Sequence, residues 1–312
     1  RFLFLNVGHT VDHLFMLIFA TVAALTLSRE WGLGYGDLIK YATPGFFAFG
    51  LFALPAGWLA DRWNRDGMMC VFFAGIGAAA ILTGFAQSPL QVGIGLFAIG
   101  IFAAIYHPVG LAIVTAKWKN TGMRIAVNGV WGNLGVASAA LLTGYLIDNG
   151  GWRLAFILPG VISIGFALLY MVLRRHELVA LNTLRAKGAE VGRAPLDKDL
   201  KAILMRVAAI VFLTAAVSSI IFQSTTFSLP RIFDERLQGI AASLVEWLKI
   251  VGFPGKADTA TTIGAFAFIV FTVASFAQLV VGSALDRFGP RRVFIVVAAI
   301  QLVFFAVMPG LS

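Results

Sequence analysis

The chain has 312 residues, of which 59% are apolar and 12% are charged, and its mean hydropathy is +0.89. Soluble domains carry about 25% charged residues, so this composition excludes an ordinary soluble domain and indicates a membrane protein. The net charge of +9 is more typical of basic membrane loops than of a nucleic-acid surface, and the single cysteine, Cys70, excludes an intramolecular disulfide.

Nine apolar stretches reach or approach the length of about 20 residues that a membrane-spanning helix needs. They cover residues 2–27, 42–60, 68–86, 90–115, 124–147, 153–173, 203–230, 261–284 and 292–309. The first stretch exceeds a signal-peptide core of about 7–15 residues, and the chain opens on Arg1 instead of Met. The sequence therefore predicts an all-α, multi-pass membrane protein.

The first stretch contains three ionisable side chains in the sequence GHTVDH, residues 8–13. His9, Asp12 and His13 are spaced i, i+3 and i+4, so they share one face of a helix. Charged groups at bilayer depth cost several kcal/mol and mark functional sites. Asp12 lies about 16 Å along the helix from Arg1.

The fourth stretch carries His107 between Tyr106 and Pro108, about 15 Å from its end at Lys117. Because this helix runs opposite to the first, His107 and Asp12 are expected at similar depth. Pro108 cannot donate a backbone hydrogen bond, which predicts a kink in the helix.

These four polar groups are predicted to converge on a proton-coupling site. Burial disfavours the charge of Asp12 and a neighbouring histidine favours it, so such a pair can exchange a proton. Asp12 is the predicted proton carrier, His9 and His107 are its partners or substrate contacts, and His13 is the weakest member. The alternative is a structural cluster that holds the first and fourth helices together.

Stretches five and seven supply small and uncharged polar residues. Gly129, Gly132 and Gly135 in the fifth stretch permit close helix packing. The seventh stretch contains SSIIFQSTTFSLP and no charge. The predicted substrate contacts are Tyr106, Asn133, Gln223 and Thr226, although the hydroxyl of Thr226 could equally bond its own helix backbone.

Two longer connections separate the stretches. Residues 174–202 are polar and basic with interspersed Gly and Pro, which predicts a cytoplasmic linker. Residues 231–258 predict an outside loop with a short amphipathic helix, since five apolar side chains fall on one face; an ordinary structured loop is the alternative. The five are Ile240, Leu244, Trp247, Leu248 and Val251.

One loop motif occurs twice. GWLADRWNRDG spans residues 57–67 and GSALDRFGPRR spans residues 282–292, each following an apolar stretch with Gly-x-x-x-Asp-Arg. On these motifs the chain resembles the major facilitator superfamily, whose two six-helix halves each carry such a loop. The resemblance implies a cytoplasmic gate held by an acid and a paired arginine; the alternative is a charged turn that only fixes topology. The implied gating residues are Gly57, Asp61, Arg62, Gly282, Asp286 and Arg287.

The resemblance also implies a domain organisation. Residues 1–173 correspond to the N-terminal half, 174–202 to a cytoplasmic linker and 203–312 to part of the C-terminal half, with about nine of the twelve helices. We therefore expect a truncated chain or one completed by another chain or segment. Placing the N-terminus in the cytoplasm assigns 17 of the 24 Lys and Arg residues to that side and 7 to the other.

Gly-His…Asp at residues 8–12 and His107-Pro108 resemble the fosmidomycin-resistance-like branch of this family. That resemblance implies a proton-coupled efflux transporter of a small organic molecule in the bacterial inner membrane. It is expected to act on substrate and protons within the lipid bilayer, with no enzymatic activity, nucleic acid, cofactor or metal. Two alternatives are a non-transporting subunit that binds a partner protein or pigment, and a redox protein in which His9, His13 or His107 ligate haem or metal.

Overall fold

The computed structural model describes residues 1–116, 121–186, 197–236, 238–250 and 259–307. This described part of the chain is helical throughout, without strands. Its α-helices are α1 (Phe2–Val22), α2 (Ser28–Glu30), α3 (Tyr35–Arg62), α4 (Arg65–Gly84), α5 (Pro89–Ala103), α6 (Tyr106–Thr115), α7 (Thr121–Gly150), α8 (Trp152–Ala186), α9 (Lys198–Arg236), α10 (Gln238–Ile250), α11 (Thr259–Phe288) and α12 (Pro290–Val307). A π-helical segment, Ala23–Leu27, joins α1 to α2.

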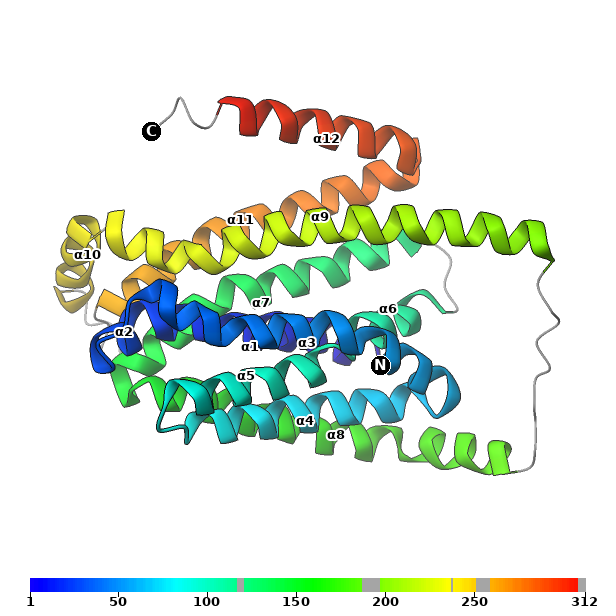
Figure 1. Ribbon diagram of the computed structural model, residues 1–312, viewed down its shortest axis with the longest axis horizontal. Coiled ribbons are helices and arrows are strands. Elements are labelled where there is room, and N and C mark those ends of the chain that lie inside the picture. The colour runs from blue at the N-terminus through cyan, green and yellow to red at the C-terminus, as the bar shows by residue number, and fades with distance from the viewer. Residues whose placement is uncertain (117–120, 187–196, 237, 251–258, 308–312) are drawn as a thin grey trace.

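The long helices run side by side along the longest axis of the molecule (Figure 1). Helices α1 to α8 form a packed bundle, while α9, α11 and α12 lie along one side of it, with α12 outermost (Figure 1). Eight helical segments in the described residues are long and apolar enough to cross a membrane. The predicted all-α membrane fold is confirmed, and α12 forms the ninth predicted stretch up to Val307, with residues 308–309 outside the described part.

Local sequence signals explain where several helices begin. The side chain of Asn64 caps α4 by accepting hydrogen bonds from the backbone N–H groups of Asp66 and Gly67, at 2.9 and 3.3 Å. Ser88 caps α5 in the same way, followed by Pro89 at the first helical position. Gly151 and Gly289 adopt φ values of +79° and +78° in the tight turns that reverse the chain between α7 and α8 and between α11 and α12.

A helix break near Pro108 and a short helix in the loop after α9 form where the sequence predicts them. The fourth stretch divides into α5 and α6 at Ala104 and Ile105, just before Pro108. Helix α10 forms inside the predicted outside loop, over Gln238–Ile250, although Val251 lies outside the described residues.

The predicted linker over 174–202 is wrong in extent. Helix α8 continues to Ala186 and α9 already begins at Lys198. The segment RRHELVALNTLRA, residues 174–186, contains neither Gly nor Pro, and charged residues such as Arg and Glu are good helix formers. A change from apolar to charged residues marks where a helix leaves the bilayer, and it does not end the helix.

Helix α7 is the element that joins the N-terminal bundle to α11. It packs lengthwise on α11 and on α1. A Cβ on Gly135 would overlap the backbone of Thr10 on α1, and a Cβ on Gly264 of α11 would overlap the backbone of Ala140 on α7. The glycines therefore allow these backbones to touch, as predicted for the fifth stretch.

Candidate functional site

Four ionisable side chains from two helices meet in the interior of the bundle. Nε2 of His107 on α6 lies 3.2 Å from Oδ2 of Asp12 on α1. Nε2 of His13 lies 3.1 Å from Nε2 of His9, one helical turn before it. The ring centroid of His107 is 5.3 Å from that of His9 and 5.6 Å from that of His13. The predicted convergence of the first and fourth stretches is confirmed, and we call these four residues the His–Asp cluster.

Hydrogen bonding determines which nitrogen of His9 carries a proton. Nδ1 of His9 lies 2.7 Å from the backbone carbonyl of Asn128 on α7. A carbonyl only accepts hydrogen bonds, so Nδ1 is the protonated nitrogen and Nε2 of neutral His9 presents a lone pair. His13 must then donate its own Nε2–H to Nε2 of His9.

A second layer of polar groups holds His9 in place. The ring of Tyr106 stacks on that of His9 with centroids 4.9 Å apart, and its hydroxyl donates to the carbonyl of Leu5 at 2.7 Å. The side-chain amide of Asn128 donates to Oδ1 of Asn6 and to the hydroxyl of Tyr106, both at 2.9 Å. Tyr106, predicted as a substrate contact, is fully buried in this network.

Sequence reasoning missed Asn6 and Asn128. Asn6 lies three residues before His9 on the same helix face, and Asn128 lies four residues before Gly132, so both could have been found by helical spacing. Gly132 itself is indispensable to the arrangement, because a Cβ there would lie 2.6 Å from the His9 ring.

Asp12 is the anomalous member of the cluster. It is completely buried, and its contact with His107 lacks the alignment of a hydrogen bond. Neither carboxylate oxygen has a hydrogen-bond partner among the described residues. A buried carboxylate without an aligned donor is costly, so Asp12 is the polar group of this site that the folded protein satisfies least.

The remaining predicted substrate contacts lie outside the cluster. Asn133 on α7 and Gln223 on α9 are partly buried, and Oγ1 of Thr226 donates to the carbonyl of Phe222 on its own helix at 2.8 Å. On α9, the ring of Phe222 packs edge-on against His13 of the cluster, with the two ring centroids 6.3 Å apart. Sequence reasoning did not single out Phe222.

A small cavity lies between the N-terminal bundle and helices α9 and α11. Its volume is about 10 Å³, and it is lined among others by Leu17, Thr21 and Thr226. That volume holds about one water molecule, so this cavity is too small for an organic substrate.

The two loop motifs differ in their surroundings. In the first motif, Oδ1 of Asp61 accepts from Arg65 at 2.8 Å on the surface, and the guanidinium of Arg62 lies over the ring of Trp58 at 4.3 Å. Arg62 is therefore not the partner of Asp61, contrary to the implied acid–arginine pair. Gly57 permits close approach to α6, since a Cβ there would lie 3.2 Å from Pro108.

In the second motif the acid reaches another helix. The carboxylate of Asp286 lies at Gly122 in the first turn of α7, so close that a Cβ on this glycine would overlap it, and Gly282 lies equally close to Ala126. A carboxylate at this position is stabilised by the helix dipole. Arg287 does not pair with Asp286 but lies near its neighbour Phe288, 5.2 Å from the ring centroid.

The opposite end of the α7–α11 contact carries a matching arrangement. Oδ2 of Asp148, near the end of α7, accepts hydrogen bonds from the backbone N–H of Thr261 at 2.9 Å and from its hydroxyl at 2.5 Å. Thr261 lies in the first turn of α11. Each of the two antiparallel helices thus contributes a carboxylate to the N-terminus of the other.

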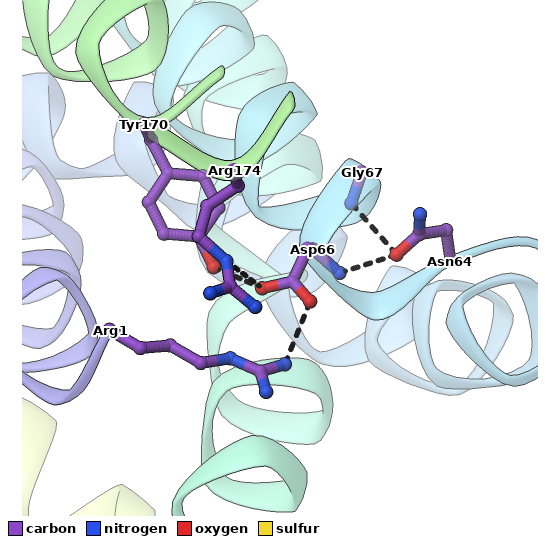
Figure 2. A network of polar contacts seen from close by, with 6 residues as sticks. All are labelled: Arg1, Asn64, Asp66, Gly67, Tyr170 and Arg174. Atoms are coloured by element: carbon purple, nitrogen blue, oxygen red, sulfur yellow. Dashed lines mark hydrogen bonds and ion pairs between the residues drawn. The ribbon is translucent and has the colours of Figure 1, made fainter. Parts of the chain in front are cut away.

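A further polar network lies at the end of the bundle that carries the first loop motif, and Figure 2 shows it. Asp66 in the first turn of α4 accepts from Arg1 at 2.8 Å and from the hydroxyl of Tyr170 on α8 at 2.5 Å, and Nε of Arg174 lies 3.6 Å away. This network ties α1, α4 and α8 together.

Apolar helices long enough to cross a membrane, a repeated loop motif and a polar cluster between helices are features that membrane transport proteins share. A sequence profile of the Major Facilitator Superfamily matches residues 5–311. The chain belongs to this superfamily, whose members are transporters and not enzymes.

Individual relatives agree with this assignment. The chain is 29% identical over 153 residues to the probable sulfoacetate transporter SauU of Cupriavidus necator, covering 48% of this chain and 35% of the relative. It is 26% identical over 278 residues to the probable 4-methylmuconolactone transporter of Cupriavidus pinatubonensis, covering 82% of this chain and 61% of that protein. The matched part of the chain thus spans less than two thirds of these relatives.

Among solved structures, a peptide transporter with bound alafosfalin superposes with a TM-score of 0.51 at 16% identity, covering 93% of this chain and 68% of that one. A bacterial homologue of the lysosomal transporter Spinster gives a TM-score of 0.50 at 17% identity, covering 89% and 74%. These similarities show the fold alone.

Proposed function

We propose that the chain is part of a secondary transporter that moves a small organic molecule by alternating access, driven by protons that bind at Asp12. The observation that carries the proposal is the buried carboxylate of Asp12 with one histidine 3.2 Å away and no hydrogen-bond donor among the described residues. An intramembrane acid of this kind is most readily explained by a function that loads and unloads it.

Organic acids are the proposed substrate class. The relatives include proteins named as transporters of sulfoacetate, gallate, 4-hydroxybenzoate and niacin, each of which carries a carboxylate. The histidines of the His–Asp cluster, when protonated, would attract such an anion, and Asn133 and Gln223 would add hydrogen bonds once the halves separate.

Outward movement is proposed on two grounds. The Gly-His…Asp and His-Pro motifs resemble the fosmidomycin-resistance-like branch, to which we assign the chain. A relative that is 30% identical over 135 residues, covering 42% of this chain, is named as the puromycin resistance protein of Streptomyces alboniger. We place the protein in a bacterial inner membrane with its N-terminus in the cytoplasm, because the basic residues are biased toward that side.

The α7–α11 contact is the proposed gate between the halves. Asp286 at the N-terminus of α7 and Asp148 at the N-terminus of α11 close its two ends. Alternating access requires that these ends open in turn, and a carboxylate–helix contact is weak enough to break and re-form.

The experiment that tests the proposal is substrate-linked proton movement in proteoliposomes. Full-length wild-type protein is compared with Asp12→Asn and with Asp37→Asn, a control at an exposed aspartate paired with Lys40. We expect candidate organic acids to elicit proton movement in wild type and Asp37→Asn, and none in Asp12→Asn. Retained coupling in Asp12→Asn would refute Asp12 as the proton carrier.

A further inference from the structure

We infer that His9, His13 and His107 form a binding site for a late first-row transition-metal dication, of the class of Zn²⁺, Co²⁺ and Ni²⁺. One ring nitrogen from each histidine lies within 4.8 Å of the others. Neutral imidazole is a preferred ligand of these ions, and three histidines are a sufficient protein ligand set for a four-coordinate site. The sequence predicts that these side chains converge, and the structure adds that one nitrogen of each ring lies within reach of the others.

His9 already presents a free nitrogen lone pair to a metal ion. The backbone carbonyl of Asn128 holds the proton of His9 on Nδ1, so its Nε2 lone pair points toward His13. This hydrogen bond is the outer-layer contact that typically orients a metal-binding histidine. His13 must move its proton from Nε2 to Nδ1 before it can bind an ion through Nε2.

The distance between the nitrogens of His9 and His13 fits two ligands of one metal ion. Two nitrogens bound to one tetrahedral ion at about 2.0–2.1 Å lie about 3.3 Å apart. The Nε2 atoms of His9 and His13 are already 3.1 Å apart. The His107 nitrogen lies within 4.8 Å of the other two, so this ring must move closer to complete the set, and 34% of its side chain is exposed.

The buried carboxylate of Asp12 would favour a cation at the three histidines. Asp12 is completely buried, and its Oδ1 has no partner among the described residues. A dication bound to the three rings would offset this charge. Since Asp12 lies at Nε2 of His107, Nδ1 of this ring is left for the metal in a carboxylate–histidine–metal arrangement. The fourth coordination position then remains for water or for a carboxylate group of a transported acid.

The inference shares residues with the proposed function but does not rest on it. A metal at the histidines and a proton at Asp12 would compete, because both compensate the same buried charge. The structure therefore assigns a metal-sensitive site to the transport pathway.

The test is metal binding to the purified full-length protein in detergent, with any affinity tag removed. Co²⁺ is titrated while its visible absorption is recorded, because four-coordinate Co²⁺ absorbs more strongly than the hydrated ion, and Zn²⁺ is titrated by calorimetry. The variants are His13→Gln and His107→Gln, and the matched control is His176→Gln, which changes the fourth histidine of the chain, on α8.

We expect one equivalent of either ion to bind wild type and His176→Gln, and at least tenfold weaker binding to each cluster variant. Circular dichroism and gel filtration of the variants separate loss of ligand from loss of fold, and the wild-type titration is decisive without any variant. Absence of a one-equivalent site in wild type, or unchanged binding in both cluster variants, would overturn the inference. Absence of such a site together with intact substrate-linked proton movement would overturn the inference and leave the proposed function standing.

Discussion

Asp66 and Asp12 are both buried inside the N-terminal bundle, but their environments are opposite. Asp66 accepts hydrogen bonds from Arg1 and Tyr170, lies near Arg174, and sits in the first turn of α4 (Figure 2). Asp12 lies mid-helix, away from the helix ends, with only a poorly aligned histidine beside it. One carboxylate is surrounded by groups that stabilise its charge, and the other lacks them.

The difference supports the proposal that Asp66 is a structural acid and Asp12 a functional one. A buried charge contributes to folding only when its donors are in place, as they are around Asp66. The folded protein keeps Asp12 buried without a hydrogen bond to its carboxylate among the described residues. A proton or a cation could bind to such a group and leave it without breaking other contacts. Protonation of Asp66, in contrast, would weaken the contacts that join α1, α4 and α8.

The largest expected effect follows from Asp66→Ala. Removing this carboxylate leaves Tyr170 and Arg1 without the acceptor that they share, so we expect a loss of about 3 kcal/mol in unfolding free energy. This is the lower end of the range for a broken buried pair, because the Arg1 side chain keeps 37% exposure. Equilibrium unfolding in mixed micelles measures it. Asp61→Ala, whose partner Arg65 is on the surface, is the control and should cost under about 1 kcal/mol. Equal losses in the two variants would contradict the structural role of Asp66.

Two fully buried tyrosines give an intermediate and matched comparison. Tyr170→Phe removes a hydrogen bond to a charged carboxylate, and we expect a loss of about 1.5–3 kcal/mol. Tyr106→Phe removes two bonds with neutral partners, one to the carbonyl of Leu5 and one from the side-chain amide of Asn128, with an expected loss of about 1–2 kcal/mol. The same unfolding assay reports both. A larger loss at Tyr106 would mean that the network around His9 is more important for stability than the network around Asp66.

The smallest change in stability is expected for Asp12→Asn. The amide keeps the shape of the side chain and removes a poorly compensated charge, so the unfolding free energy should stay within about 1 kcal/mol of wild type or rise. Thermal unfolding followed by circular dichroism in the same detergent tests this. A loss as large as that of Asp66→Ala would show that Asp12 is a structural acid and would remove the contrast between the two sites.

The sequence by itself determined the membrane class, the helical stretches, the shared face of His9, Asp12 and His13, and the depth of His107. These properties follow from length, apolar composition and the 3.6-residue period, which each helix carries alone. Pro108 likewise acts through local geometry. The outcome at residues 174–186 shows the limit, because a change to charged residues reports the membrane boundary and not the end of a helix.

Only the tertiary structure decided which partners the buried groups receive. The rotation of each helix about its axis, set by packing, brings the carbonyl of Asn128 to His9 and the hydroxyl of Tyr170 to Asp66. It also leaves Asp61 of the loop motif on the surface with Arg65, while Asp66, five residues later, is buried. Helical spacing places a side chain on a face, but the contacts of that face depend on neighbouring helices that are distant in the sequence.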